Sequence, residues 1–468
     1  MNNFHFSKII AGVGPTLAKE TVLSKVINFV DVFRISLSGG FDDNNKKYID
    51  TIMKLDNSKT IMLETKGTDI RVKNVLEVSV RKGGTITMDY SEYAQENDKR
   101  VFIDYPYIKD LPNGTKIYFQ QSDISLKIKS TKDEFVVCEV LQGGKILQYD
   151  RVDFGNHEID FPFFTEKDKK DILRGLEYGV HMLATSNIKT VDDVIQVKDF
   201  MTEQNASQMK VIAKIENAQA LNNIKAINEI SDGIIIVYDK ISSFMTKKKI
   251  TLESLIKDIR SSGKPVVINF IDNFGTNKYP LTDEAYIKKL CYRGVDGFML
   301  DIMLKEEDPL NIITKMSDML DKYELRIQPK ETERFDHDDE AMIRDYIIFN
   351  AYRVTQEVEV RAIVCFTENG YTSARLSALN PKVPVITFTK LDETYRYLNM
   401  IWGSRGYKIS QSFNYENLKR IGKEMIRIIF KGNISLDDKI LIVQANEYQK
   451  DHKSDMINGV ELYKFKNI

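Results

Sequence analysis

Cysteine is scarce in this chain. Only Cys138, Cys291 and Cys365 occur, far apart and without the close spacing of metal ligands. A disulfide scaffold and a zinc-finger type of site are therefore not expected, and the pattern suits buried thiols in a reducing compartment. The five histidines and the single tryptophan, Trp402, form no cluster in the sequence. We interpret them as structural residues.

Charge of one sign and long apolar runs are also lacking. Lys and Arg number 67 against 68 Asp and Glu, for a formal net charge of −1. Such a balance does not favour nucleic acid or an anionic membrane surface as a partner. The sequence shows no signal-peptide-like start and no run of membrane-spanning length. These absences predict a soluble, cytoplasmic globular protein.

At 468 residues the chain has room for about three domains. Short apolar segments alternate with helical patterns, which is typical of βαβ units and a parallel sheet. Pro15 and Thr16 are expected to open the first helix. Eight such segments match the strand number of a (β/α)₈ barrel; they are residues 9–14, 30–36, 61–64, 181–184, 211–215, 233–237, 265–269 and 297–300.

Two other regions differ from the barrel pattern. Residues 72–159 show alternating polar and apolar positions with Gly-Gly and Asn-Gly turn signals, which predicts an inserted small β-barrel domain. Residues 331–468 alternate helices and strands again, which predicts a smaller α/β domain. The expected order is barrel (1–71), insert (72–159), barrel (160–330) and α/β domain (331–468).

Residues 211–217, with the sequence VIAKIEN, contain the main candidates for catalytic and metal-binding side chains. Lys214 and Glu216 lie two positions apart at the end of a strand and share one face. A carboxylate can bind a metal ion there, while the ammonium offsets charge that develops on an oxyanion. An ordinary ion pair at a strand end explains the same two residues, and the pattern leaves both interpretations open.

Six segments in order resemble the motifs of the pyruvate kinase family, along essentially the whole chain. They are KIIAGVGP (8–15), RISLSGG (34–40), ETKGTDIR (64–71), KIEN (214–217), TENGYT (367–372) and NMIWG (399–403). The family moves a phosphoryl group from phosphoenolpyruvate to ADP, using Mg²⁺ or Mn²⁺ and usually K⁺. Such a reaction depends mostly on positioning and electrostatic stabilisation.

The resemblance implies a role for each matching residue. Lys214 and Arg34 would be catalytic, with Arg34 on the phosphoryl group and Lys214 near the enolate, and Glu216 would bind the divalent metal. Arg71 and Lys66 would contact substrate or nucleotide. The potassium positions would be Ser36, Ser38, Glu64 and Thr65. An effector phosphate would bind at Thr367, Asn369, Gly370, Thr372 and Ser373.

Several departures from the family pattern fall on the chemistry. Lys240 replaces the second metal-binding aspartate, and a cation beside Glu216 repels a divalent ion. A one-residue slip would instead bring in Asp239 as the ligand. Phe270 replaces the threonine placed for proton delivery. Gly39 replaces a histidine, and Asp150 stands where the family has a nucleotide-facing lysine.

Three functional hypotheses follow. The leading one is a catalytically weak or inactive pyruvate kinase paralogue that acts as a structural or regulatory subunit in a dimer or tetramer with pyruvate kinase chains. The second is an active enzyme that holds its metal with Glu216 and Asp239. The third is a phosphate-ligand sensor that uses Arg34, Arg71 and the 367–373 loop. None of them involves nucleic acid or a membrane.

Overall fold

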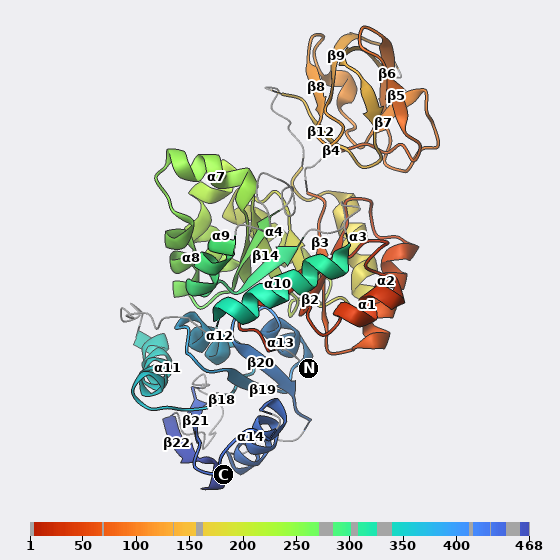
Figure 1. Ribbon diagram of the computed structural model, residues 1–468. Helices are drawn as coiled ribbons and strands as arrows, with labels where there is room; N and C mark the ends of the chain where they lie inside the picture. Colours follow the sequence, from red (N-terminus) through yellow and green to blue (C-terminus); the bar gives the residue numbers. More distant parts are fainter. Residues whose placement is uncertain are drawn as a thin grey trace. The chain divides into compact units, whose positions relative to one another are not determined.

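The computed structural model describes residues 4–67, 70–133, 135–155, 162–270, 284–300, 308–324, 339–410, 415–430, 432–445 and 459–467. The chain forms two compact units (Figure 1), which are Met1–Ser36, Phe41–Glu64 and Ile172–Ile468 on one hand, and Leu37–Gly40 and Thr65–Asp171 on the other. The first unit holds the barrel and the C-terminal domain, and the second holds the insert. The domain limits at residues 71, 159 and 330 stay a prediction.

Eight parallel strands close into a barrel in the order β1-β17-β16-β15-β14-β13-β3-β2, which confirms the predicted barrel. Each strand is a short, almost wholly buried apolar run, as expected for strands covered on both faces. Their bounds are β1 Lys8–Gly12, β2 Val32–Ser36, β3 Thr60–Glu64, β13 Met182–Thr185, β14 Lys210–Ile215, β15 Gly233–Val237, β16 Val266–Phe270 and β17 Gly297–Leu300.

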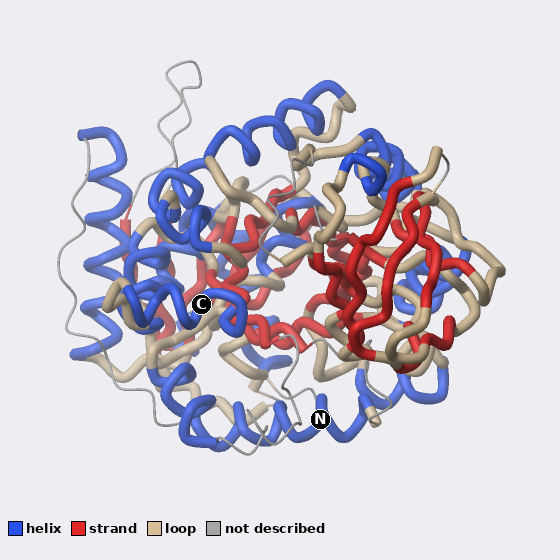
Figure 2. The backbone as a smooth tube through the Cα atoms, turned by 90° about the horizontal axis from the view of Figure 1, so that it is seen from above, coloured by secondary structure: helices blue, strands red, loops and turns tan. Residues whose placement is uncertain are grey.

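Helices follow the strands and surround them (Figure 2). In α8, the residues at helical spacing face inward and are buried, among them Leu252, Leu255, Ile256 and Ile259. The helices of this part are α1 Glu20–Val26, α2 Asp43–Leu55, α3 Glu166–Glu177, α4 Val191–Glu203, α5 Ala218–Asn222, α6 Ile224–Ile230, α7 Tyr238–Lys247, α8 Leu252–Ser261, α9 Glu284–Tyr292 and α10 Pro309–Glu324.

The expected helix start at Pro15 and Thr16 is wrong. The chain passes through turns there, with the amide of Ala18 bonded to the carbonyl of Gly14 at 3.0 Å. Lys19 then keeps an extended backbone, and α1 begins only at Glu20. A proline fixes φ for a helix start, but it does not exclude a turn with the same φ.

Aspartates at the amino ends of the strands fix the register of their neighbours. Asp232 Oδ2 accepts the amide of Val211 at 3.0 Å, and Asp296 Oδ2 accepts the amide of Val266 at 2.9 Å. Each aspartate precedes its own strand and binds the first residues of the adjacent strand. The strand starts are thereby aligned, and so are the polar residues at the opposite, carboxyl ends.

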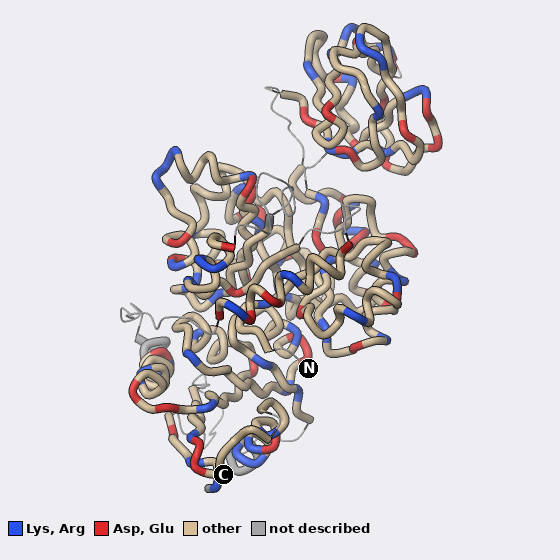
Figure 3. Tube along the Cα trace, in the orientation of Figure 1, with Lys and Arg blue, Asp and Glu red and all other residues tan. Residues whose placement is uncertain are grey.

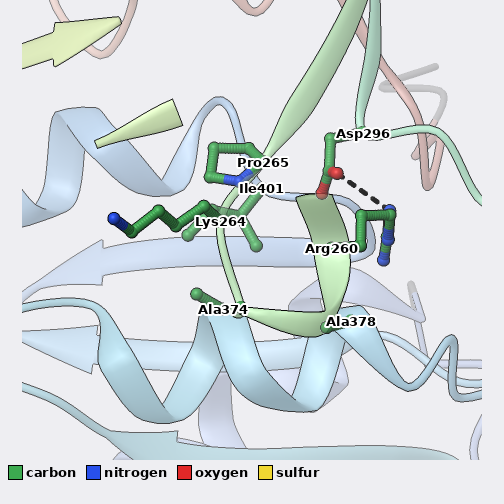
Figure 4. Close-up of a pocket in the computed structure, with 8 residues that line it drawn as sticks. Arg260, Lys264, Pro265, Asp296, Ala374, Ala378 and Ile401 are labelled. Carbon is green, nitrogen blue, oxygen red and sulfur yellow. Dashed lines mark hydrogen bonds and ion pairs between the residues drawn. The ribbon is translucent and has the colours of Figure 1, made fainter. Parts of the chain in front are cut away.

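The amino ends of the barrel strands pack against the C-terminal domain through the buried guanidinium of Arg260 (Figure 4). Nη1 lies 2.9 Å from Asp296 Oδ2, and Nη2 donates to the carbonyl of Ser377 at 2.6 Å and to Asn380 Oδ1 at 3.0 Å. Asp296 Oδ1 also accepts the amide of Trp402 at 3.0 Å. A buried ion pair with hydrogen bonds to both domains therefore joins the two domains of this unit.

The C-terminal domain is a five-stranded sheet in the order β20-β19-β18-β21-β22, with only β22 antiparallel to its neighbour. Strands and helices alternate along the described part of this domain, as expected from the sequence, and β22 is added at one edge of the sheet. The bounds are α11 Asp339–Glu357, β18 Ala362–Phe366, α12 Tyr371–Ala378, β19 Val385–Thr389, α13 Asp392–Leu398, β20 Ser404–Lys408, α14 Tyr415–Ile429, β21 Lys439–Gln444, β22 Gly459–Lys464 and the 3₁₀ turn Phe465–Asn467.

The second unit contains a seven-stranded sheet in the order β4-β12-β8-β9-β10-β6-β7. A bridge between Val72 and Ile103 nearly closes this sheet, in agreement with the predicted small barrel. The strands are β4 Ile70–Arg71, β5 Val78–Val80, β6 Thr85–Tyr90, β7 Arg100–Ile103, β8 Lys116–Phe119, β9 Ile124–Thr131, β10 Val136–Gln142, β11 Gly144–Ile146 and β12 Arg151–Asp153; β5 pairs with β11, and a 3₁₀ turn covers Ile108–Asp110.

Basic and acidic residues are interspersed along the trace of each unit (Figure 3). This arrangement agrees with the near-zero net charge of the sequence. Among the described residues, no helix combines the length and the apolar character needed to cross a bilayer.

Candidate active site

Charged side chains occupy the carboxyl-end mouth of the barrel. Val32, Met62 and Ile212 belong to the apolar core that includes the barrel interior. Because side chains alternate along a strand, the residues two positions further on point to the same side. Those residues are Arg34, Glu64 and Lys214. The barrel therefore brings together three of the residues that the sequence singled out, at the end where such barrels carry their active sites.

Glu64 is the centre of a buried ionic cluster. Its Oε1 lies 2.8 Å from Arg34 Nη1 and 3.1 Å from Lys214 Nζ. Lys214 also donates to Ser186 Oγ at 3.2 Å. Burial would raise the pKa of the Glu64 carboxyl, but the charges of Arg34 and Lys214 outweigh burial and lower this pKa to about 2. The carboxylate is therefore ionised at every physiological pH.

Lys214 is held in its charged form. Burial would lower the pKa of its ammonium, and the nearby carboxylates of Glu216 and Glu64 more than offset this effect, so that its pKa is raised. Of the two interpretations left open, the structure shows an ion pair of Lys214, and its partner is Glu64. Metal binding by Glu216 stays a prediction.

Glu216 is engaged through both carboxylate oxygens. Oε1 accepts the amide of Asn187 at 2.5 Å, and Oε2 contacts the ammonium of Lys240. The Glu216 side chain is 2% exposed and that of Lys240 is 20% exposed. Lys240 lies in the first turn of α7, directly after β15. The cation that the sequence placed beside this carboxylate is in contact with it.

This donor set does not fit a divalent metal. Magnesium requires several oxygen ligands in near-octahedral geometry, and Glu216 already has an ammonium against one oxygen and an amide against the other. Within the described ranges, no three His, Cys, Asp or Glu side chains gather as a metal centre would need. Both oxygens of Glu216 therefore already have partners that a divalent ion would have to displace.

Asp239, the alternative metal ligand, precedes Lys240 in the same turn of α7. The charge of Asp239 also affects Tyr286 on α9. The pKa of the Tyr286 hydroxyl is raised mainly by burial, then by Tyr238, and to a smaller extent by the charges of Glu253 and Asp239. The assignment of Asp239 to a metal stays a prediction.

The potassium assignment also stays a prediction. Ser36 and Glu64 are partners in the register between β2 and β3. Glu64 already shares its charge between two cationic side chains, which does not favour a third cation. Ser38 and Thr65 belong to the second unit.

In the second unit, Asp104 organises the two basic residues assigned to substrate or nucleotide. Its Oδ2 lies 2.8 Å from Lys66 Nζ and 3.6 Å from Lys73 Nζ, and its Oδ1 accepts the amide of Arg71 at 2.7 Å. Arg71 Nη1 donates to the carbonyl of Tyr149 at 3.3 Å. Sequence reasoning missed Asp104, which directly follows the short strand β7 and gives no separate signal.

A cavity of about 380 Å³ opens beside Lys66 in this unit. Tyr90, Tyr107 and Phe164 contribute aromatic rings to its wall. Asp168 lies on the same wall and closes the start of α3, where its Oδ2 accepts the hydroxyl of Thr165 at 2.6 Å. This contact lies at the amino end of α3, which begins at Glu166.

Three further residues depart from the family pattern, and each lies in a different environment. They are Asp150, Gly39 and Phe270. Asp150 is fully buried and accepts the amides of Gln121 and Ser122 at 2.8 and 3.1 Å, so that it closes a turn of the insert. Gly39 lies against the ring of Tyr149. Phe270 ends β16, and its side chain lies outside the described part of the structure.

The loop assigned to an effector phosphate precedes α12. Gly370 has φ +88°, and its amide donates to Thr367 Oγ1 at 3.0 Å, while Asn369 Oδ1 accepts the amide of Tyr371 at 3.0 Å. The hydroxyl of Thr372 donates to the carbonyl of Ala445 at 3.0 Å. The hydroxyl of Ser373 lies 2.8 Å from the Ser404 hydroxyl. The hydroxyls have internal partners, and the effector role stays a prediction.

Asn269 is a polar residue of the barrel that sequence reasoning missed. Val267 belongs to the interior core cluster, so alternation directs the side chain of Asn269 to the same face. It is 1% exposed, and neither Oδ1 nor Nδ2 has a hydrogen-bond partner among the described residues. A buried amide without partners is costly and calls for an explanation.

The fold and the site define a (β/α)₈ barrel protein with a buried ionic cluster at the carboxyl ends of its strands. Residues 4–301 match the barrel domain of pyruvate kinase, and residues 345–458 match the pyruvate kinase alpha/beta domain. The chain is 27% identical over 422 residues to pyruvate kinases of Staphylococcus aureus strains MRSA252 and USA300, a match that covers 85% of this chain and 70% of theirs. The chain belongs to the pyruvate kinase family.

Proposed function

We propose that this chain is a catalytically weak or inactive member of the pyruvate kinase family, and that it acts as a structural or regulatory subunit in an oligomer with a pyruvate kinase chain. Pyruvate kinases transfer a phosphoryl group from phosphoenolpyruvate to ADP, normally with Mg²⁺ and K⁺, and are generally oligomers. The three buried free cysteines suit a cytoplasmic location for this function.

The contact between Lys240 and Glu216 is the observation that supports loss of activity. Phosphoryl transfer needs cations that neutralise the charge developing on the phosphoryl oxygens. A lysine bound to the carboxylate supplies one positive charge, where a divalent ion would supply two and several coordination positions. Arg34 and Lys214 are retained, so that the anion-binding part of the site remains without its metal.

Turnover tests this proposal. Pyruvate formation from phosphoenolpyruvate and ADP would be measured with Mg²⁺ or Mn²⁺ and K⁺, for the purified chain alone and mixed with an active relative from the same source. We expect little or no turnover alone and altered kinetics of the relative in the mixture. Metal-dependent turnover by the chain alone that is lost in Asp239→Ala would instead establish an active enzyme using Glu216 and Asp239.

A further inference from the structure

Lys240 supplies the cation that contacts Glu216. Its ammonium contacts Oε2, and the amide of Asn187 fixes Oε1 at 2.5 Å, so that the carboxylate is held in one orientation. The Lys240 side chain comes from the first turn of α7 and keeps 20% of its surface exposed, while Glu216 is almost fully buried. The exposed part of Lys240 can therefore face a second anion.

Three cationic side chains of the described residues come together at the barrel mouth. They are Arg34, Lys214 and Lys240, and they contact the carboxylates of Glu64 and Glu216. Since the cluster is largely buried, a small anion beside these cations would interact with them more strongly than in water.

Asn269 provides a second, independent indication of a ligand. It lies on β16 in register with Val237, the last residue of β15, while β15 itself pairs with β14, the strand that ends before Glu216. Its amide is buried, and among the described residues neither of its polar atoms has a partner. A ligand oxygen at the barrel mouth would accept a hydrogen bond from Nδ2.

We infer that Lys240 is a built-in cation that replaces the divalent metal, so that the barrel mouth binds a small oxyanion, a phosphate or carboxylate group, without any metal. Arg34 and Lys214 supply the other positive charges, and the Asn269 amide supplies a hydrogen bond. The inference deepens the proposed function and rests on it, because it states what this site binds when it lacks the metal.

Calorimetric titration with inorganic phosphate, and with malonate as the carboxylate probe, tests the inference. We expect the Kd of the better ligand to change less than about twofold between EDTA and millimolar Mg²⁺, since no metal takes part. Malonate binding without phosphate binding would assign the site to carboxylates, and the reverse would assign it to phosphates. Absence of binding by both, or binding that requires Mg²⁺, overturns the inference.

Glu216→Gln should change the affinity for the anion in opposite directions, depending on whether Lys240 or a metal ion is the cation of the site. If Lys240 is the cation, removal of the carboxylate leaves its charge uncompensated, and the anion binds about fivefold more tightly. If a metal is the cation, loss of its ligand weakens binding. Weakened binding by this variant therefore also overturns the inference.

Two further variants are matched to a control. Lys240→Met should weaken anion binding about tenfold, and Asn269→Ala should weaken it by a similar factor through loss of a hydrogen bond to a charged group. Lys248→Met removes the same charge from the end of α7, where its ammonium contacts Asn222, and should leave the Kd unchanged. An equal effect of Lys248→Met would show a general charge effect and contradict the inference.

Metal binding and turnover separate this inference from the proposed function. Lys240→Asp restores a carboxylate, and electron paramagnetic resonance should detect Mn²⁺ bound to this variant and not to the parent chain. Metal-dependent turnover of the parent would overturn the proposed function and, because it requires a bound metal, the replacement of that metal by Lys240 as well. No turnover and no anion binding would overturn the inference alone.

Discussion

Lys240 and Glu216 form an ion pair at the carboxyl end of the barrel, with the carboxylate 2% and the lysine side chain 20% exposed. The pair links the first turn of α7 to the end of β14. A buried carboxylate without its partner is strongly unfavourable, whereas removal of both charges is often nearly neutral. Each charge is therefore needed to compensate the other, although the pair as a whole adds little net stability.

Lys240→Met should lower the free energy of unfolding by about 1–3 kcal/mol, because Glu216 would lose its cation while remaining buried. The double variant Glu216→Gln/Lys240→Met should recover most of this loss. Urea denaturation of the parent, both single variants and the double variant gives the coupling energy of the pair. Strictly additive effects in this cycle would contradict a direct interaction.

The fold was largely predictable because barrel strands leave a strong pattern in the sequence. The strands 233–237 and 297–300 have the predicted bounds, since each is a short apolar run buried on both faces. The strand Gly459–Lys464 could not be predicted in the same way. It lies at the edge of its sheet with several exposed side chains, and among the described strands it pairs with β21 alone.

Lys214, Glu216 and Lys240 of the candidate site were identified from the sequence, as was the position of Lys240 beside Glu216, whereas the partner of Lys214 was not. The pairing of Lys214 with Glu64 depends on strands that lie about 150 residues apart in the chain. Asn269 gave no signal, because an asparagine in an apolar strand does not reveal whether its amide finds a partner. Closure of the barrel determines both the pairing of Lys214 with Glu64 and the surroundings of the Asn269 amide.

Arg260→Met should destabilise the first unit by about 3–5 kcal/mol, because the buried carboxylate of Asp296 would lose its cation and two C-terminal acceptors would lose their donor. Thermal and urea unfolding measure the change. Arg420→Met is the control, because Arg420 forms an exposed pair with Glu424 on α14 and should cost less than about 1 kcal/mol. Equal effects of the two variants would show that Arg260 does not join the domains.

Substitution of Gly294 and of Gly179 by alanine distinguishes the cost of steric overlap from the cost of backbone strain. Both have positive φ, +66° and +70°, but a Cβ at Gly294 would overlap the side chain of Asn380, whereas a Cβ at Gly179 would meet nothing within 4 Å. Gly179→Ala should cost about 1–2 kcal/mol for the left-handed backbone alone. Gly294→Ala should cost about 1–3 kcal/mol more through overpacking. Similar unfolding free energies for the two variants would contradict the close contact with Asn380.

The pH dependence of stability tests the buried carboxyl of Glu324 at the end of α10. Its oxygens accept the amides of Phe6 and Ser7 at 2.7 and 2.6 Å, which ties the N-terminal segment to this helix. Burial raises the pKa of this carboxyl to about 7, although the amide hydrogen bonds and Lys8 oppose the shift. A pKa that is higher in the folded state contributes stability below the unfolded value near 4.5, and this contribution is lost as the pH rises toward 7.

We therefore expect the free energy of unfolding to fall by up to about 3 kcal/mol between pH 4.5 and 7.5 through this single group, at about 1.4 kcal/mol per pKa unit. Glu324→Gln cannot titrate, and its profile over this window should be flatter, even if the amide fits the two N–H donors less well and lowers stability at every pH. Glu20→Gln, at an exposed position on α1, should keep the slope of the parent. Urea denaturation at half-unit pH steps measures all three profiles, and a Glu324→Gln slope equal to that of the parent would show that Glu324 does not titrate in this range.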